Sequence, residues 1–482
     1  MDTFLKDPSV GDETSAPASP ASKSIENVTY DEISIGRSAS ISRVLRREDI
    51  ELFAQVSGDT NPAHLDVEYA EGTLFKGVIG HGVWSASIIS AVLGTCLPGP
   101  GTIYLSQDLK FRRPVRPGDR VTATITAKEK RDDKKIVVFT CEVTNQTGDV
   151  VLSGDATVIA PRDKIIRPRI CLPELQVLDH NGHEALLMKC RGLEAIRAAV
   201  VYPTDQVSLL GAVEAAAAGL IHPVLVGPAA KIREVAERHG IGLSACEFVE
   251  AADDHAAAAR AVELVRDGQA LTLMKGNLHS DILLGEVVRR ESGLRTGRRV
   301  SHVFVMHLPG RERPLLVTDA AVLMYPTLDE KVDIARNAID LAHVLGIDVP
   351  RLAVLSAVET VNAKIPSTLD AAALTVMASR GQITGAIVDG PLAFDNAVDA
   401  EAARIKGIRS EVAGRADILL VPNFEAGNMV AKELSKLAHA DGAGIVMGAR
   451  CPIVLTSRSD DERTRVASCA VAVLVAHAVK GA

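Results

Sequence analysis

Two residues in the first quarter of the chain, Asp59 and His64, have the types and the spacing for proton transfer. They lie five positions apart, on either side of a turn that contains Pro62, and His81-Gly82 follows before an apolar segment. A carboxylate and an imidazole can exchange protons with one bound water, and an N–H group at a helix start can stabilise a developing oxyanion. The pattern indicates proton transfer beside a carbonyl group, with Asp59 and His64 as the acid–base pair and Gly82 as the N–H donor.

The same residues also allow a structural interpretation, in which Asp59 caps the following turn and His64 is a surface histidine. Two neighbours are further candidates. Asn61, inside the turn, is assigned to substrate binding, and Ser90, two turns along the expected helix, is assigned to fixing His64 or the water.

The elements around this pair predict a small α+β domain over residues 29–160. Residues 1–28 are rich in Ser, Ala and Pro and predict a disordered leader. From His81 the sequence is apolar nearly all round, which predicts a buried helix. Strand-like runs follow at 103–111, 120–129, 135–146 and 150–159, separated by turn sequences. One buried helix and a meandering antiparallel sheet predict a hotdog fold, and because hotdog domains commonly pair, we expect at least a homodimer.

A second set of candidates lies near strand ends in the rest of the chain. Lys275, His279 and Ser280 follow a predicted strand and precede a helix, where backbone N–H groups can approach a phosphate. A strand at 453–456 ends at Ser457-Arg458, and Arg is the side chain best shaped to hold phosphate. These residues predict a phosphate-binding site.

The second half alternates between short apolar strands and helices. Residues 161–185 predict a linker. Strands are predicted at 222–227, 270–274, 300–306, 352–356, 385–388, 417–421 and 444–447. This alternation indicates a mostly parallel α/β sheet with sites at the carboxyl ends of its strands, and its length predicts two lobes around a cleft over residues 186–482.

From residue 44 to residue 159 the chain resembles the MaoC-like, (R)-specific enoyl-CoA hydratases. The resemblance is carried in order by His64-Leu65-Asp66, Gly80-His81-Gly82, the segment 97–104 and the segment 111–119. It implies that Asp59 and His64 are the catalytic pair.

From residue 186 to the end, the chain is similar to the phosphate acetyl/butyryl transferases. The segments 317–321, 356–361, 389–395 and 422–428 and Ser457-Arg458 carry this likeness. It implies a two-lobed α/β fold like that of the isocitrate and isopropylmalate dehydrogenases. Arg458 would bind phosphate and Ser457 would stabilise the departing phosphate or the oxyanion. The motif residues Asp319, Asp389 and Asn428 are assigned to substrate binding.

Taken together, the two resemblances predict a multidomain bifunctional enzyme that acts on acyl-CoA. The acid that takes the CoA thiol proton is left open between Asp460 and Asp461, because the chain crowds its acids immediately after Ser457-Arg458. That departure keeps an alternative, in which the second half is a non-catalytic CoA-sensing and oligomerising module. Another alternative makes the first half only an acyl-CoA-binding or dimerising domain.

Composition limits the remaining classes. A net charge of −8 with no long basic run disfavours nucleic-acid binding, and no apolar stretch reaches the ~18–20 residues of a membrane span. Seven scattered cysteines and the lack of a targeting signal predict a cytoplasmic protein. We expect no metal and no organic cofactor, with CoA thioesters and phosphate or acyl phosphate as substrates. His180 and His183 lack further ligands at metal spacing.

Overall fold

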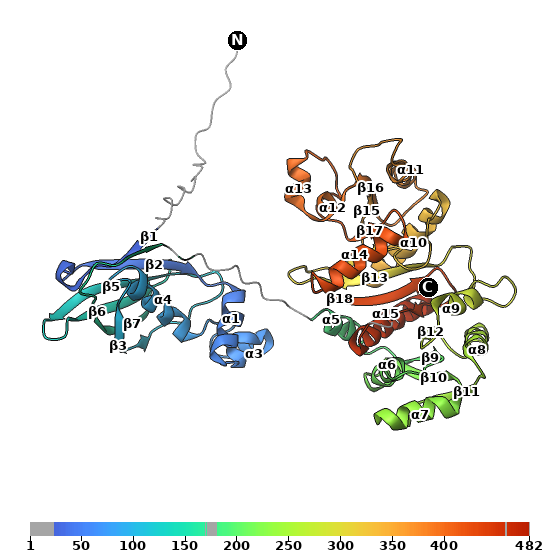
Figure 1. The fold of residues 1–482 in the computed structure, drawn as a ribbon, viewed down its shortest axis with the longest axis horizontal. Coiled ribbons are helices and arrows are strands. Elements are labelled where there is room, and N and C mark those ends of the chain that lie inside the picture. Colours follow the sequence, from blue (N-terminus) through green and yellow to red (C-terminus); the bar gives the residue numbers. More distant parts are fainter. Residues whose placement is uncertain (1–23, 169, 171–180, 458–459, 482) are drawn as a thin grey trace, which may run out of the picture. The chain divides into compact units, whose positions relative to one another are not determined.

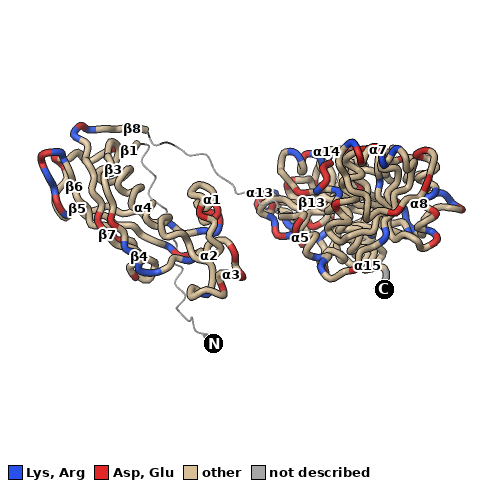
Figure 2. Tube along the Cα trace, turned by 90° about the horizontal axis from the view of Figure 1, so that it is seen from below, with Lys and Arg blue, Asp and Glu red and all other residues tan. Residues whose placement is uncertain are grey.

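The computed structural model describes residues 24–168, 170, 181–457 and 460–481, and the chain divides between residues 177 and 178 into two compact units (Figure 1). Each unit is described by itself. Most of the predicted leader and part of the predicted linker lie outside the described residues. In both units, Lys and Arg positions are interspersed with Asp and Glu positions rather than gathered by sign (Figure 2).

The first unit is an antiparallel sheet with one long helix packed on it. The sheet has the order β2-β5-β6-β7-β3, and β4 also pairs with β7. The strands are β2 (Ser38–Val44), β3 (Ile103–Gln107), β4 (Lys110–Phe111), β5 (Arg120–Arg131), β6 (Ile136–Thr144) and β7 (Val150–Ile159). Helix α4 (Gly82–Thr95) contacts β5 and β2, and its buried residues join the core beneath the sheet.

One expectation about α4 is wrong for the single chain. Ile88, Ile89, Val92 and Leu93 are buried, but Val83 on the opposite face is 58% exposed. The sheet covers one side of the helix, so apolar composition all round did not lead to burial all round within one chain.

The structure adds strands that the sequence pattern did not reveal. β2 is largely polar and exposed, so it shows no apolar alternation. β1 (Ser24–Glu26) pairs antiparallel with β8 (Ile166–Pro168), which joins the end of the predicted leader to the start of the predicted linker. Short helices α1 (Arg47–Ser57), α2 (Pro62–Leu65) and α3 (Val67–Gly72) precede α4.

The second unit is built on a sheet of 11 strands within the described residues, with the order β11-β10-β9-β12-β19-β18-β13-β14-β17-β15-β16. The strands are β9 (Ile196–Val201), β10 (Ile221–Gly227), β11 (Glu247–Glu250), β12 (Thr272–Lys275), β13 (Ser301–His307), β14 (Leu315–Thr318), β15 (Arg351–Leu355), β16 (Ile387–Leu392), β17 (Ile418–Leu420), β18 (Asp441–Met447) and β19 (Ile453–Val454). β9, β11 and β14 were not predicted.

Three antiparallel pairings in the middle of this sheet reverse its direction. β18 runs antiparallel to both β19 and β13, and β13 runs antiparallel to β14. The strands from β11 to β12 and β19 therefore point one way, whereas β14, β17, β15 and β16 point the other way. The two groups present their carboxyl ends at opposite edges of one sheet.

Helices cover the sheet and close the unit. They are α5 (Gly182–Lys189), α6 (Gln206–Ala217), α7 (Ala229–His239), α8 (Asp254–Arg266), α9 (Ser280–Val287), α10 (Leu328–Val344), α11 (Pro366–Ser379), α12 (Phe394–Val398), α13 (Ala400–Ile405), α14 (Phe424–Lys436) and α15 (Glu462–Gly481). The C-terminal α15 packs against α6, α5 and β18. It therefore ties the two ends of this unit's sequence together. In the described part of the chain, no helix has the length and apolar composition needed to cross a bilayer.

Candidate active sites

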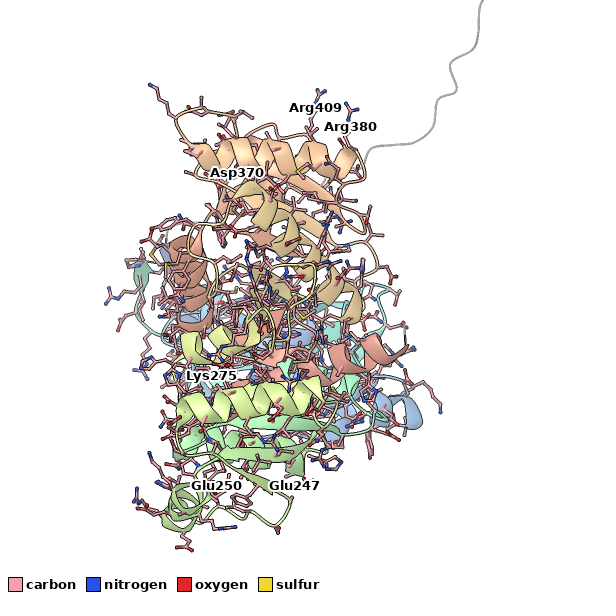
Figure 3. All side chains as sticks on the ribbon, turned by 90° about the vertical axis from the view of Figure 1, so that its right-hand side faces the viewer. Glu247, Glu250, Lys275, Asp370, Arg380 and Arg409 are labelled. Atoms are coloured by element: carbon pink, nitrogen blue, oxygen red, sulfur yellow. The ribbon has the colours of Figure 1, made fainter. Side chains whose placement is uncertain are left out.

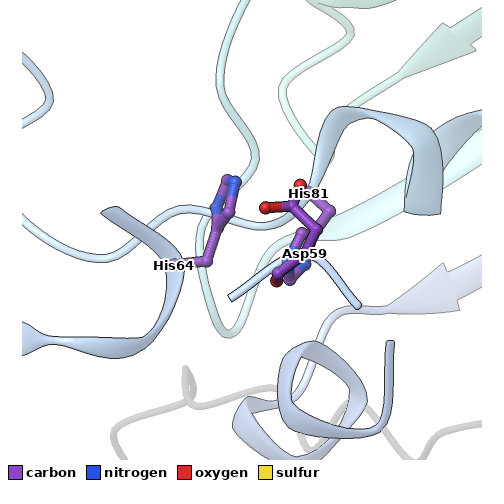
Figure 4. Close-up of side chains that lie close together, drawn as sticks. All are labelled: Asp59, His64 and His81. Carbon is purple, nitrogen blue, oxygen red and sulfur yellow. The ribbon is translucent and has the colours of Figure 1, made fainter. Parts of the chain in front are cut away.

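Three side chains from separate segments converge in the first unit: Asp59, His64 and His81 (Figure 4). One oxygen or nitrogen atom of each lies within 4.8 Å of the corresponding atoms of the other two. The rings of His64 and His81 are 4.0 Å apart between centroids and tilted by 35°. His81 is buried, whereas Asp59 is exposed, so the cluster has one open side.

Backbone carbonyl groups determine where each imidazole carries its proton. His64 Nδ1 lies 2.8 Å from Ile79 O, and His81 Nε2 lies 3.0 Å from Asp59 O. Because a carbonyl oxygen only accepts, these nitrogens carry the hydrogen in the neutral rings. His64 Nε2 is therefore left as a basic nitrogen. His81 Nδ1 is buried and has no hydrogen-bond partner among the described residues.

Local hydrogen bonds hold the turn between Asp59 and His64. Asp59 Oδ1 accepts from the Asn61 N–H at 3.2 Å, and Asn61 Oδ1 accepts from the Ala63 N–H at 3.0 Å. Asn61 is thus the N-cap of α2, with Pro62 at the first helical position. These contacts give Asn61 a structural task at the place where the sequence predicts substrate binding.

A pocket of about 290 Å³ lies beside the cluster. Its lining includes His64, His81, Gly82, Ser85 and Phe111. Gly82 is the first residue of α4, so its N–H has no acceptor within the helix, and a Cβ there would lie 2.9 Å from Phe111 Cε1. The N-terminus of α4 therefore faces the pocket at Gly82, where no side chain covers the backbone N–H.

Two residues of this site differ from the sequence expectation. Ser90 is exposed and does not line the pocket in the single chain, whereas Ser85, one turn after His81, does. His81 received no role from sequence reasoning. Its place in Gly80-His81-Gly82, directly before the helix start, was the signal that could have identified it.

The second candidate site lies at the carboxyl ends of β12 and β19, which are parallel neighbours. Lys275 ends β12 and is buried, and His279 is the N-cap of α9, which Ser280 begins. Figure 3 shows Lys275 between the part that carries Glu247 and Glu250 and the part that carries Asp370 and Arg380. The pairing of β12 with β19 brings the Lys275 loop beside the loop that begins at Ser457.

The backbone of Ser457 is held on both sides by charged residues. The Ser457 N–H donates to Asp460 Oδ2 at 2.7 Å, and Arg465 Nη2 donates to Ser457 O at 3.0 Å. One residue before Thr456, Leu455 O accepts from His302 Nε2 at 3.0 Å. Arg458 lies outside the described residues.

The two acids that follow differ in environment. Burial raises the pKa of Asp460, against the opposing effect of the Ser457 N–H. Burial also acts to raise the pKa of Asp461, but hydrogen bonds from the Thr464 N–H and hydroxyl outweigh it, and the net pKa is lowered. Asp461 Oδ1 accepts from Thr464 N at 2.8 Å, so this residue caps the start of α15.

Three predicted binding residues lie away from this edge of the sheet. Asp319 follows β14, whose carboxyl end points opposite to that of β19, and Asn428 contacts Ala320 O in the same region. Asp389 lies on β16, near the far end of the sheet order. The carboxylate of Asp319 is buried and accepts from the N–H groups of His302, Ala321, Val322 and Leu323. Its contacts therefore organise the backbone of the loop after β14.

The folds and sites define a MaoC-like hotdog domain followed by an α/β phosphotransacylase domain, and comparisons with known proteins agree. The family model "MaoC like domain" matches residues 30–148, and "Phosphate acetyl/butaryl transferase" matches residues 254–473. The chain is 58% identical over 296 residues to a phosphate acetyltransferase of Rhizobium meliloti, which covers 61% of this chain and 94% of that protein.

Further relatives match each unit. A phosphate butyryltransferase of Clostridium acetobutylicum is 43% identical over 60% of this chain and 97% of its own length. A branched-chain phosphotransacylase from Enterococcus faecalis V583 is 31% identical over 58% of this chain and 99% of its own, with a TM-score of 0.52. The R-hydratase PhaJ1 of Pseudomonas aeruginosa is 42% identical over 32% of this chain and 99% of its own, with a TM-score of 0.31.

The chain belongs to the phosphate acetyl/butyryl transferase family and carries a MaoC-like domain ahead of its transferase domain. It is an enzyme that joins a hydratase-type lyase domain to a phosphate acyltransferase domain, as the two resemblances in the sequence predict.

The buried His302 leads to a prediction about acid stability. Burial lowers its pKa from 6.5 to about 4. Below pH 6.5 the His302 imidazole takes up a proton in the unfolded chain but stays neutral in the folded unit. The free energy of unfolding therefore falls as the pH decreases toward 4, by up to about 1.4 kcal/mol per pH unit. Gln in place of His302 keeps an N–H donor for Leu455 O and removes this titration.

Amide hydrogen exchange of β13 and β19, measured between pH 7 and pH 4.5, reports on this unit. The fluorescence of Trp84, the single tryptophan of the chain, reports on unfolding of the first unit, so the two units are followed separately. After correction for intrinsic exchange rates, His302→Gln should lose less opening free energy with acid than the wild type. Identical pH dependence in the two proteins would contradict the assignment.

Proposed function

We propose that the chain catalyses (R)-specific hydration of trans-2-enoyl-CoA in its first unit and reversible acyl transfer between CoA and phosphate in its second. The observation that carries the first activity is the cluster of Asp59, His64 and His81 beside a pocket that His64, His81 and Gly82 at the start of α4 line. The second activity is supported by family membership and by the loop at Ser457 beside Lys275.

In the hydration step, one water lies between the Asp59 carboxylate and His64 Nε2. One of these groups takes a proton from the water as the water oxygen bonds to the β-carbon, and the pair then delivers that proton to the α-carbon, so both groups end in the protonation state in which they began. The Gly82 N–H donates to the thioester oxygen, which carries negative charge in the enolate-like transition state. The Ile79 carbonyl keeps the His64 proton on Nδ1 and so leaves Nε2 available for the water.

The pocket matches a short acyl chain bound as its CoA thioester. Its volume is near the lower end of small-molecule sites. Apolar residues line most of it, and Arg112 and Arg113 are the charged members of the lining. Guanidinium groups suit the phosphates of CoA, whereas the apolar wall suits the enoyl chain.

In the transfer step, the CoA thiolate attacks the carbonyl carbon of an acyl phosphate, and the C–O bond to phosphate breaks as the thioester forms. A carboxylate takes the thiol proton, and the leaving phosphate takes the bonding pair. Asp460 suits the base better than Asp461, because a raised pKa favours proton uptake and Asp461 caps α15. Arg458 and Ser457 are assigned to the phosphate and to the tetrahedral oxyanion.

The similar proteins favour a short acyl group. Two of the relatives described above are a phosphate acetyltransferase and a phosphate butyryltransferase, with 58% and 43% identity. We therefore assign acetyl to butyryl groups to the second site.

Single substitutions should separate the two activities. Asp59→Asn removes one of the two proton-exchanging groups and should lower hydration of crotonyl-CoA about a hundredfold or more, with acyl transfer unchanged. Arg458→Ala should abolish thiol release from acetyl-CoA and phosphate, with hydration unchanged. Absorbance at the enoyl thioester band and a thiol reagent measure the two reactions.

The pattern of failure is informative. Loss of both activities in either variant would contradict two independent sites. A folded wild-type chain that releases no thiol from acetyl-, propionyl- or butyryl-CoA would instead favour a CoA-sensing module in the second unit. A wild-type chain that does not hydrate crotonyl-CoA would favour a binding role for the first.

The first unit also exposes an apolar edge, which supports the proposed homodimer. β3 is at the end of the strand order, and its residues Ile103, Tyr104 and Leu105 are 56%, 40% and 49% exposed. An edge strand with large exposed apolar side chains is normally covered. A second copy of β3 is the occupant that matches it, because two such edges can pair about a two-fold axis.

Glu in place of Leu105 should separate the paired edges, since it puts a charge on each copy at the interface. The particle mass of the full chain, measured by sedimentation, should fall by about half. Leu74→Glu, at a leucine that is 83% exposed outside the sheet, is the matched control and should leave the mass unchanged. An unchanged mass for Leu105→Glu would contradict pairing through β3.

A further inference from the structure

Arg465, in the first turns of α15, carries a buried guanidinium group. This group has more N–H donors than the described residues around it have acceptors for. Its residue is 3% exposed. Nη2 donates to Ser457 O, but neither Nε nor Nη1 has a hydrogen-bond partner among the described residues. An unsatisfied buried donor costs about 1–3 kcal/mol, and more when it is charged. The hydrogen bonding of this group is therefore incomplete without an acceptor.

The acidic side chains around Arg465 do not accept hydrogen bonds from its remaining N–H groups. Asp460 and Asp205 act on it electrostatically, but no described carboxylate hydrogen-bonds to it. Asp460 Oδ2 accepts from the Ser457 N–H, and Asp205 accepts from the N–H and hydroxyl of Ser208. Burial lowers the pKa of Arg465, which reflects a charge compensated only from a distance.

The fold makes space for this side chain. Gly211 on α6 faces Arg465, and a Cβ there would lie 2.9 Å from Arg465 Cδ and 3.0 Å from Arg465 Cβ. Thr456, the residue before Ser457, also has a buried hydroxyl without a partner among the described residues. Unsatisfied donors thus gather on both sides of Ser457.

We propose that Arg465 is a phosphate-binding residue of the transferase site. Nη2 holds the Ser457 carbonyl, and the remaining N–H groups donate to oxygens of the substrate phosphate. The same side chain therefore fixes Ser457 and places positive charge where the phosphate departs. This inference rests on the proposed acyl transfer, and it adds a residue that the Ser457-Arg458 motif does not contain.

Inorganic phosphate is the probe. Arg465→Met keeps an unbranched apolar side chain and removes the charge and the donors. Calorimetric binding of phosphate to the full chain should weaken about tenfold or more, and KM for phosphate should rise by the same factor. KM for acetyl-CoA should change less than about threefold, since the proposal gives the donors of Arg465 to the phosphate and none to CoA. Arg463→Met, at an exposed arginine of the same helix turn, is the control and should bind phosphate as the wild type does.

Two results would overturn the assignment. One is wild-type phosphate affinity in folded Arg465→Met. The other is an equal loss of affinity for phosphate and acetyl-CoA, which would show that Arg465 only supports the loop. Partial recovery of phosphate binding in Arg465→Lys, which restores the charge, supports the proposal.

A measurement on the wild type keeps the test independent of the variant's folding. Phosphate should slow amide exchange in the peptide that spans residues 455–466, and unchanged exchange there would count against the proposal. If phosphate binds in this way but no thiol is released from any acyl-CoA, the acyl-transfer proposal fails while the Arg465 assignment stands.

Discussion

Hydrogen bonds from buried or half-buried imidazoles to backbone carbonyls link segments in both units. His64 bonds to Ile79 O, His81 to Asp59 O, and His302 to Leu455 O. A carbonyl oxygen accepts only, so each bond fixes the tautomer of a neutral ring and links the ring to a neighbouring segment. In the first unit this leaves His64 Nε2 as a base beside Asp59. In the second, the same type of bond holds the strand end that leads to Ser457.

Several polar residues that the sequence marks as candidates for substrate binding or catalysis accept hydrogen bonds from backbone N–H groups instead. Asn61 caps α2, Asp461 caps α15, and Asp319 accepts four N–H groups. A buried or half-buried turn must satisfy its N–H groups, and short acidic or amide side chains do so at small distance. Conversely, His81 and Arg465 retain polar atoms without partners among the described residues, and both lie beside candidate reactive groups.

The sequence predicted most elements wherever they carry a clear apolar pattern. β10, β12, β13, β15, β17 and β18 overlap the predicted strands, and α4 begins directly after His81 as expected. β2 and β11 were missed, because their exposed or half-buried residues show little apolar alternation. β9 and β14 are short and fully apolar apart from single polar residues, and such runs do not distinguish a strand from part of a helix.

The sequence by itself determined the two families, the hotdog and α/β classes, and the pairing of Asp59 with His64, because these depend on local spacing and motif order. Tertiary structure decided which residues meet. It brought His81 to His64 and Arg465 to Ser457. It also placed the carboxyl end of β14 opposite to that of β19, so Asp319 and Ser457 lie at different edges. The direction of each strand and the packing of α15 against the start of the unit depend on contacts between segments far apart in the sequence. A local sequence pattern does not contain this information.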